Sequence, residues 1–154
     1  MIDFTVKEEL ASGIWDEIQP LLIQHWQEIG HYKTIPLDPD KNVYLALEEK
    51  KISRVYVARK EDGGMIGYAV YFINYHPHHK SSLQAVSDIV YISPEYRGGV
   101  GRLLIKSCDE RLVAEGVEVI YYHVHAPHNF GPMLERMGYD LEDFIYSKHL
   151  KKEN

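Results

Sequence analysis

Three glycines and two arginines lie close together in the second half of the chain. Gly98, Gly99 and Gly101 lack side chains, so backbone N–H groups there can converge on a bound anion. Arg97 and Arg102 flank them and could each neutralise part of a phosphate through directional N–H donors. A plain helix-capping turn would explain the glycines alone. The whole pattern predicts a phosphate-binding turn between a strand and a helix N-terminus.

The strands that must position this turn can be predicted from hydrophobic periodicity. Alternating or β-branched runs indicate strands, and Asp62-Gly63-Gly64 and Pro94 mark the ends of such runs. The segment 76–82 is expected to be a loop, because Pro77 and its polar neighbours would break a ladder. Strands are expected over residues 2–6, from 52 to the turn at 62–64, and over 65–75, 84–92 and 117–124, with one or two more within 139–150.

Apolar residues at helical spacing predict four helices. The first is expected to be capped by Ser12, to be kinked or divided at Pro20 and to end at Gly30. The others are expected over 42–50, from 101 to a stop at 115–116, and over 127–137. This order, with an antiparallel meander in its middle, is a mixed α/β layout and does not alternate as a doubly wound nucleotide-binding fold would.

The segment SDIVYISPEYRGGVGRLLIKSCDERL closely resembles the GNAT superfamily of N-acetyltransferases, whose pyrophosphate loop typically reads Arg/Gln-x-x-Gly-x-Gly/Ala. The segment HNFGPMLERMGYD resembles the family's Asn-rich helix and Gly-Phe/Tyr element, so the resemblance covers roughly the last 90 residues. Aligning Gly99 and Gly101 with the family glycines places Tyr96 at the Arg/Gln position. Aligning Arg97 there instead makes the loop one residue shorter, and we favour this second alignment.

The resemblance implies a single domain over residues 1–154 that binds acetyl-CoA. It implies a mixed, mostly antiparallel central sheet of six to seven strands, with splayed central strands and helices on both faces. Asn129 would bond the pantetheine arm, although a helix N-cap explains this residue equally well. The residues that would hold the cosubstrate are Val90, Tyr91 and Ile92 through backbone N–H groups at the thioester, and Arg97, Gly98, Gly99, Val100, Gly101 and Arg102 at the pyrophosphate.

Acetyl transfer to an amine also needs a proton acceptor, because the neutral form of an alkylamine lies about 4 to 5 kcal/mol above its ammonium form at pH 7. The resemblance places Asp88 in that role, and apolar neighbours would raise the pKa of its carboxyl group. A purely structural role as a hydrogen-bond acceptor is the alternative. The family's usual acid, a tyrosine, is replaced by Leu134. Tyr146 or Tyr139 could substitute for it, and His76 is a secondary candidate for the base.

Histidines are frequent in this chain, notably at positions 76, 78, 79, 123 and 125. Their spacing matches no compact zinc site, so we expect no metal. The single cysteine, Cys108, excludes an internal disulfide and falls on an apolar helical stripe, where it would pack and not act as a nucleophile.

Composition restricts the partners. A net charge of -6 argues against nucleic acid, and no apolar run is long enough to span a membrane. The first residues carry no signal-peptide pattern, so we expect a cytoplasmic protein. The acceptor would be a primary amine of a small molecule or peptide that attacks directly in a ternary complex, and the resemblance leaves a homodimer open. The alternatives are a catalytically silent acyl-CoA sensor and, more remotely, a nucleotide-phosphate-binding regulator.

Overall fold

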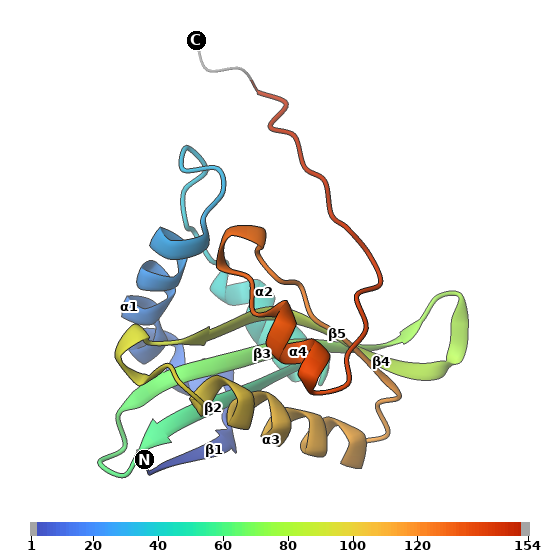
Figure 1. Cartoon of the computed structure of the whole chain (residues 1–154), viewed down its shortest axis with the longest axis horizontal. Coiled ribbons are helices and arrows are strands. Elements are labelled where there is room, and N and C mark those ends of the chain that lie inside the picture. Colours follow the sequence, from blue (N-terminus) through green and yellow to red (C-terminus); the bar gives the residue numbers. More distant parts are fainter. Residues whose placement is uncertain (1–2, 152–154) are drawn as a thin grey trace.

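The computed structural model describes residues 3–151 and contains one five-stranded sheet with the order β1-β2-β3-β4-β5 (Figure 1). The first four strands are antiparallel neighbours, whereas β5 runs parallel to β4. Their bounds are β1 Phe4–Glu8, β2 Ser53–Lys60, β3 Met65–His76, β4 His79–Ile92 and β5 Val119–Tyr121. The predicted meander in the middle of the chain is therefore confirmed.

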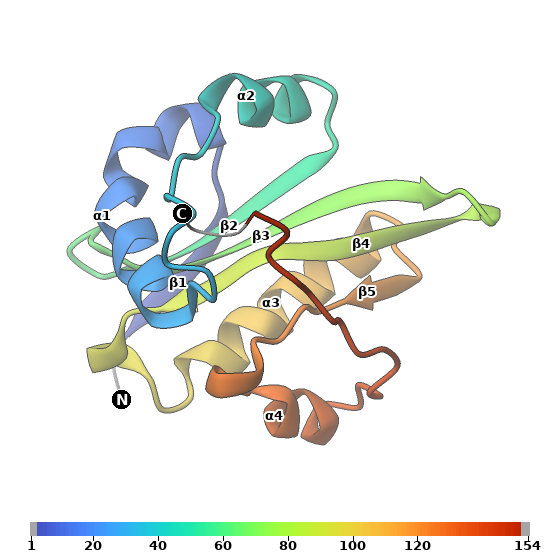
Figure 2. The ribbon, with the colours of Figure 1, turned by 90° about the horizontal axis from the view of Figure 1, so that it is seen from above.

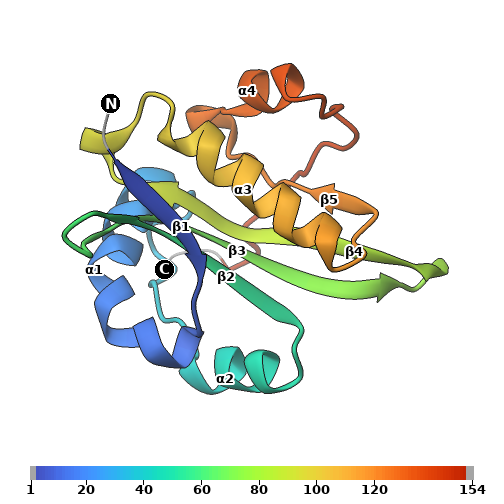
Figure 3. The ribbon, with the colours of Figure 1, turned by 90° about the horizontal axis from the view of Figure 1, so that it is seen from below.

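Helices cover both faces of this sheet, as Figures 2 and 3 show from opposite sides. Helices α1 and α2 lie on one face, and α3 and α4 lie on the other. Their bounds are α1 Ala11–Ile29, α2 Lys41–Glu49, α3 Val100–Ala114 and α4 Gly131–Arg136. Two single 3-10 turns, η1 Pro94–Tyr96 and η2 Ala126–His128, precede α3 and α4.

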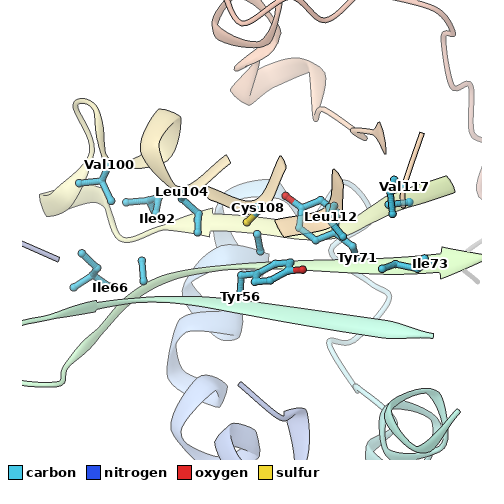
Figure 4. Packing of buried hydrophobic residues seen from close by; sticks show 13 residues of the cluster. Tyr56, Ile66, Tyr71, Ile73, Ile92, Val100, Leu104, Cys108, Leu112 and Val117 are labelled. Carbon is cyan, nitrogen blue, oxygen red and sulfur yellow. The ribbon is translucent and has the colours of Figure 1, made fainter. Parts of the chain in front are cut away.

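Alternation along the central strands divides the core into two layers. In β2, Val55 and Val57 pack toward α1, whereas Tyr56 and Ala58 pack toward α3. The α3 stripe includes Cys108, which is fully buried beside Tyr56 and Tyr71, as Figure 4 shows. The hydrophobic periodicity thus predicted the buried face of α3 correctly. The two core layers hold the sheet between them in a fixed position.

The sheet opens where β4 meets β5. Their parallel pairing joins Gln84–Val86 to Val119–Tyr121 and extends no further, although β4 continues to Ile92. In the ladder with β3, Val70 pairs with Ile89 and Tyr71 with Ser87, so Asp88 is an extra, bulged residue. A bulge bends its strand and redirects the side chain that it carries. The bulge therefore lies where β4 leaves its parallel neighbour.

The last residues of β4 lie unusually close to β3. A Cβ atom added to Gly67 would lie 2.5 Å from the carbonyl oxygen of Tyr91 and 2.4 Å from the Ile92 side chain. No side chain fits in that space, so glycine at position 67 allows the close approach of the two strands.

Several expectations from the sequence are wrong in detail. The predicted sheet of six to seven strands has five, because residues 139–150 form no strand. Strand β5 has only three residues, which leaves too short an edge for another strand to pair with. The predicted loop at 76–82 is a tight turn of two residues, and β4 begins at His79. The predicted first strand overlaps β1, but residues 1–2 lie outside the described range.

The helix boundaries also differ from the prediction. Ser12 does not cap α1, because this helix begins after Leu10. The Ser12 hydroxyl donates to Glu48 of α2 instead, at 2.7 Å. Helix α1 runs through Pro20 as one element. Helix α4 begins at Gly131 and not near 127, because the Asn129 side chain accepts the Gly131 N–H and forms the turn that starts it.

A polar cluster joins the segments around α4 to α3. The hydroxyls of Tyr139 and Tyr122 donate to Oδ1 of Asp109, at 2.7 and 3.3 Å, and Tyr122 also contacts the Tyr71 hydroxyl at 2.7 Å. Burial raises the pKa of Asp109 above its ordinary value, although the two tyrosine hydrogen bonds oppose this shift. The ionised carboxylate is therefore a cost to the fold.

This cost predicts a pH-dependent effect of Asp109→Asn. Because the folded-state pKa is raised, the stability from Asp109 is complete below the unfolded pKa and is lost as pH rises through the folded pKa. Urea unfolding between about pH 4 and pH 8 measures the free energy of unfolding of both proteins. The value for the variant should increase relative to that of the parent protein as pH rises. Glu118→Gln, which removes an exposed carboxylate just before β5 that does not act on Asp109, is the control and should gain nothing. If the free energies of unfolding of Asp109→Asn and of the parent protein changed equally with pH, ionised Asp109 would not be the destabilising group.

Candidate functional site

A cavity of about 500 Å³ lies beside the open part of β4. Its walls come from the C-terminal half of α1, the end of β4, the glycine turn, the start of α3 and the segment 123–133. The residues predicted from sequence that line it are Asp88, Val90, Tyr91, Ile92, Arg97, Gly98, Gly99, Gly101, Arg102 and Asn129. The fold therefore brings together the predicted anion turn and the predicted proton acceptor.

Four predicted site residues do not line this cavity. Tyr139 is one of them, because its hydroxyl donates to Asp109 of α3 instead. The Val100 side chain is buried in the core, although its backbone belongs to the glycine turn. His76 lies at the tip of the β3–β4 hairpin. Tyr146 lies in the irregular segment after α4, where its side chain is 92% exposed. Neither His76 nor Tyr146 is placed to act at the cavity in this structure.

The glycine turn supplies unpaired backbone donors. Gly98 and Gly99 have φ angles of 111° and 114°, in the left-handed region that disfavours other residues. A Cβ at either position would meet no protein atom within 4 Å, so the turn faces open space. Within residues 3–151, the N–H groups of 98–102 have no hydrogen-bond acceptor. They converge at the N-terminus of α3, where the helix dipole adds positive potential.

Arg97 is held at the edge of this turn by contacts on three sides. Its Nε donates to the Ile92 carbonyl at 2.9 Å, and its guanidinium lies over the Tyr91 ring at 5.6 Å. Nη2 donates to Oε2 of Glu28 on α1 at 2.7 Å, and this ion pair lowers the pKa of Glu28. Nδ1 of His128 lies 3.7 Å from the other oxygen of Glu28. Glu28 thus joins α1 to both loops that border the cavity.

The open edge of β4 provides further backbone groups. Val90, Tyr91 and Ile92 pair with β3 on one side and have no β5 residue opposite them on the other. In an antiparallel pair, successive residues direct their N–H and C=O groups to alternate sides of the strand. Some of the backbone groups of this stretch therefore face the cavity side, unused by the sheet.

Asp88 lies at the opposite end of the cavity from the glycine turn. Its Oδ2 accepts a hydrogen bond from the Tyr44 hydroxyl on α2 at 2.7 Å, whereas Oδ1 accepts none from the described residues. Burial raises the pKa of Asp88, and the Tyr44 hydrogen bond and nearby His123 partly offset this shift. The N–H of His123 donates to the Ser87 hydroxyl at 3.0 Å, which holds this histidine across the opening from β4. The carboxylate is thus partly desolvated and has a free oxygen.

His25 of α1 forms another part of the wall. Its Nδ1 lies 3.0 Å from the Tyr68 hydroxyl, and its ring stacks on Tyr91 with centroids 4.8 Å apart. Burial lowers the pKa of His25 to about 4, so the ring is neutral near pH 7. His25 is buried on α1 together with Ile14 and Ile18, so its position in the sequence gave no sign of its contact with the cavity.

Other wall residues were also missed by the sequence analysis. Glu28 lies on α1, whereas His123, His125 and His128 share the segment 123–133, and only the fold brings Glu28 to this segment. The high histidine content was the one sequence signal that pointed to the three histidines, and no signal pointed to Glu28. Leu134, at the position where the family usually has tyrosine, is buried in α4 and is no proton donor.

Residues 3–151 contain no group of three or more His, Cys, Asp and Glu side chains arranged to hold a metal ion. No helix within the same range has the length and apolar character required to cross a membrane.

The fold is shared with solved acetyltransferases of low sequence identity. A ribosomal-protein-alanine N-acetyltransferase from Brucella melitensis biovar Abortus 2308 is 18% identical over 99% of both chains, with a TM-score of 0.73. A predicted acetyltransferase with acetyl-CoA from Clostridium acetobutylicum is 14% identical over 96% of this chain and 97% of that one, with a TM-score of 0.74.

An aminoglycoside acetyltransferase from an uncultured soil metagenomic sample is 16% identical over 96% of this chain and 97% of that one, with a TM-score of 0.72.

No curated protein sequence matches the chain. The model of the acetyltransferase (GNAT) family matches residues 15–139. This range includes the glycine turn, the open edge of β4 and every residue that lines the cavity. The chain therefore belongs to the GNAT family of acetyltransferases.

Proposed function

We propose that this acetyltransferase moves an acetyl group from acetyl-CoA to a primary amine, of a small molecule or a peptide, by direct attack in a ternary complex. The observation that carries the proposal is the continuous path from unpaired N–H groups at 98–102, along the open edge of β4, to the carboxylate of Asp88. An anion site and a proton acceptor thereby border one cavity, and acetyl transfer to an amine needs both.

The glycine turn fits a diphosphate. Five successive N–H groups that find no acceptor among the described residues lie at a helix N-terminus, and such a group favours a negatively charged ligand. Arg102 forms no ion pair within residues 3–151 and stands at the first turn of α3. The open space at Gly98 and Gly99 leaves room for a phosphate against the backbone. We assign 97–102 to the pyrophosphate of acetyl-CoA, and Asn129 to its pantetheine arm through the amide group that lines the cavity.

When bound there, acetyl-CoA would supply an activated acetyl group as a thioester. The neutral amine nitrogen forms the new C–N bond, the C–S bond breaks, and the thiolate of CoA leaves. The nitrogen then loses its extra proton to give the amide, and the thiolate takes up a proton. Backbone N–H groups of 90–92 are assigned to the thioester oxygen, because β5 leaves that edge of β4 unpaired. A thiol pKa of about 8.5 lets thiolate depart with little protonation, so a missing acid at Leu134 does not stop the reaction.

Asp88 is assigned to the amine proton. An acceptor ammonium must lose a proton before attack, and the free Oδ1 of Asp88 faces the cavity end that the glycine turn does not occupy. Its raised pKa makes it a better base than an ordinary aspartate.

No covalent enzyme intermediate is required. The one cysteine, Cys108, has a side chain that is fully buried on α3 and lies outside the cavity lining. Burial raises the pKa of its thiol to about 12, so thiolate is absent near neutral pH.

Binding of acetyl-CoA is tested by thermal unfolding. A ligand that binds only the folded protein stabilises it by about 2.7 kcal/mol at a concentration of 100 times its Kd. Acetyl-CoA and CoA should both raise the Tm, and ATP or NAD should raise it less, because neither supplies the pantetheine arm. An unchanged Tm with acetyl-CoA, or a larger shift with ATP, would refute the assignment of the cavity.

The ion pair between Glu28 and Arg97 predicts that Glu28→Gln tightens CoA binding. The substitution removes the carboxylate that neutralises Arg97, while the Ile92 carbonyl and the Tyr91 ring still hold the guanidinium in place. Calorimetry should show a Kd lower by about threefold to tenfold, the range of one partly exposed charge. Glu17→Gln, which breaks the equivalent pair with Arg59 away from the cavity, is the matched control. Weaker binding in Glu28→Gln would show that Glu28 supports the site.

The assignment of Asp88 predicts two distinct changes in the pH–rate profile. Asp88→Asn should lower kcat by about 10²- to 10⁴-fold and abolish the acidic limb. Tyr44→Phe removes the hydrogen bond that stabilises the ionised carboxylate, so it should move the acidic limb to higher pH. The sign follows because only the ionised carboxylate accepts a proton, and its pKa rises further without Tyr44. If Asp88→Asn kept the acidic limb of the parent enzyme, another group would be the proton acceptor.

A further inference from the structure

The acceptor end of the cavity contains a carboxylate and no fixed positive charge. Asp88 forms no ion pair within residues 3–151, and its one side-chain hydrogen bond comes from the neutral hydroxyl of Tyr44. Partial burial makes an isolated carboxylate unfavourable. A cationic partner from outside the chain would remove this cost, and the amine substrate in its ammonium form is such a partner.

The positive side chains of the cavity are confined to its other end. Arg97 and Arg102 are its only Arg or Lys wall residues within the described range, and both flank the glycine turn. Arg97 is bonded to the Ile92 carbonyl, four residues along β4 from Asp88, which is roughly 13 Å at 3.3 Å per residue. A bound diphosphate would neutralise this end.

Besides the imidazoles of His123, His125 and His128 on the facing segment, two further groups near the cavity could carry a positive charge, and neither provides one at the acceptor end. His25 is neutral near pH 7, because burial lowers its pKa. The ammonium of Lys33 donates to the carbonyls of Trp26 and Gln27 at the end of α1 and lies over the Trp26 ring, outside the cavity wall. A carboxylate on the acceptor would therefore find no fixed cation here, and Asp88 would repel it.

Aromatic faces make up much of the rest of the wall. His25 stacks on Tyr91, and the rings of His125 and His128 are nearly parallel with centroids 5.9 Å apart. Phe130 lines the same cavity. Such surfaces contact the apolar body of an amine and attract a cation, but they provide nothing that compensates an anion.

We propose that the acceptor is a primary amine with no carboxylate on its amine-bearing carbon, so that free α-amino acids are excluded by charge. This inference rests on the proposed function and narrows its substrate class. The site would discriminate between acceptors as much by its unfavourable environment for a carboxylate as by its attraction for an ammonium group.

The test compares acceptors that differ in one group. Phenylalanine, phenylalaninamide and phenethylamine share a side chain, and the amide matches the carboxylate in shape without its charge. Tyrosine, tyrosinamide and tyramine form a second set, and histidine, histidinamide and histamine a third. Thiol release from acetyl-CoA gives kcat/KM for each. We expect the amide and the amine to exceed the free acid by about tenfold or more in every set that reacts, as expected for one uncompensated charge.

A protein variant tests the cause of the discrimination. His123→Arg adds a fixed cation to the cavity wall facing Asp88, so it should raise the ratio of acid to amide turnover. His76→Arg changes the net charge by the same amount at the hairpin tip, outside the cavity, and should leave this ratio unchanged. Equal changes in both variants would mean that overall charge sets the preference, which contradicts the proposal.

Each outcome of the comparison decides the inference. Free acids that react within about threefold of their amides, or faster, would overturn it while leaving acetyl transfer intact. Failure of all nine compounds as acceptors would also overturn it, since the proposed class is then not used. The thermal shift with acetyl-CoA alone is independent of the acceptor. Failure of that shift refutes the proposed function itself, so the two failures are distinguishable.

Discussion

The early end of the parallel pairing between β4 and β5 is the feature on which the rest of the site depends. Three residue pairs join the strands, and beyond Val86 the edge of β4 has no partner. A parallel sheet would normally bury these backbone groups on both sides. Here the bulge at Asp88 bends β4 at this point, and the segment after Tyr121 departs toward η2. The cavity and its unused backbone donors follow from that separation.

This open strand also divides the cavity into two electrostatic regions. At one end, helix α3 and two arginines create a positive potential. At the other end, Asp88 is a partly desolvated negative charge held by a neutral tyrosine. A strand is a rigid spacer, so the separation between these regions is fixed by the number of residues between them. An anionic donor and a cationic acceptor can therefore occupy one cavity without exchanging places.

The sequence predicted the parts of the site that are local in the chain. The glycine turn, its arginines and Asp88 lie within 15 consecutive residues, and the turn chemistry is expressed directly in residue types. Glu28 and Tyr44 escaped prediction because α1 and α2 bring them to Arg97 and Asp88, which lie 44 or more residues away in the sequence. The missing last strands have a similar cause, because strand formation in 139–150 requires an edge that the short β5 does not supply.

Gly67 shows how a residue outside the cavity can govern what happens in it. It belongs to β3 and lies against Tyr91 and Ile92 of β4, on the side away from the open edge. The residue at position 67 therefore sets how closely β4 approaches β3. Even a methyl group there would push the edge of β4 outward, toward the space in which a thioester would lie. Variation in homologous chains at this position should therefore change the geometry of the reacting groups while leaving every wall residue the same.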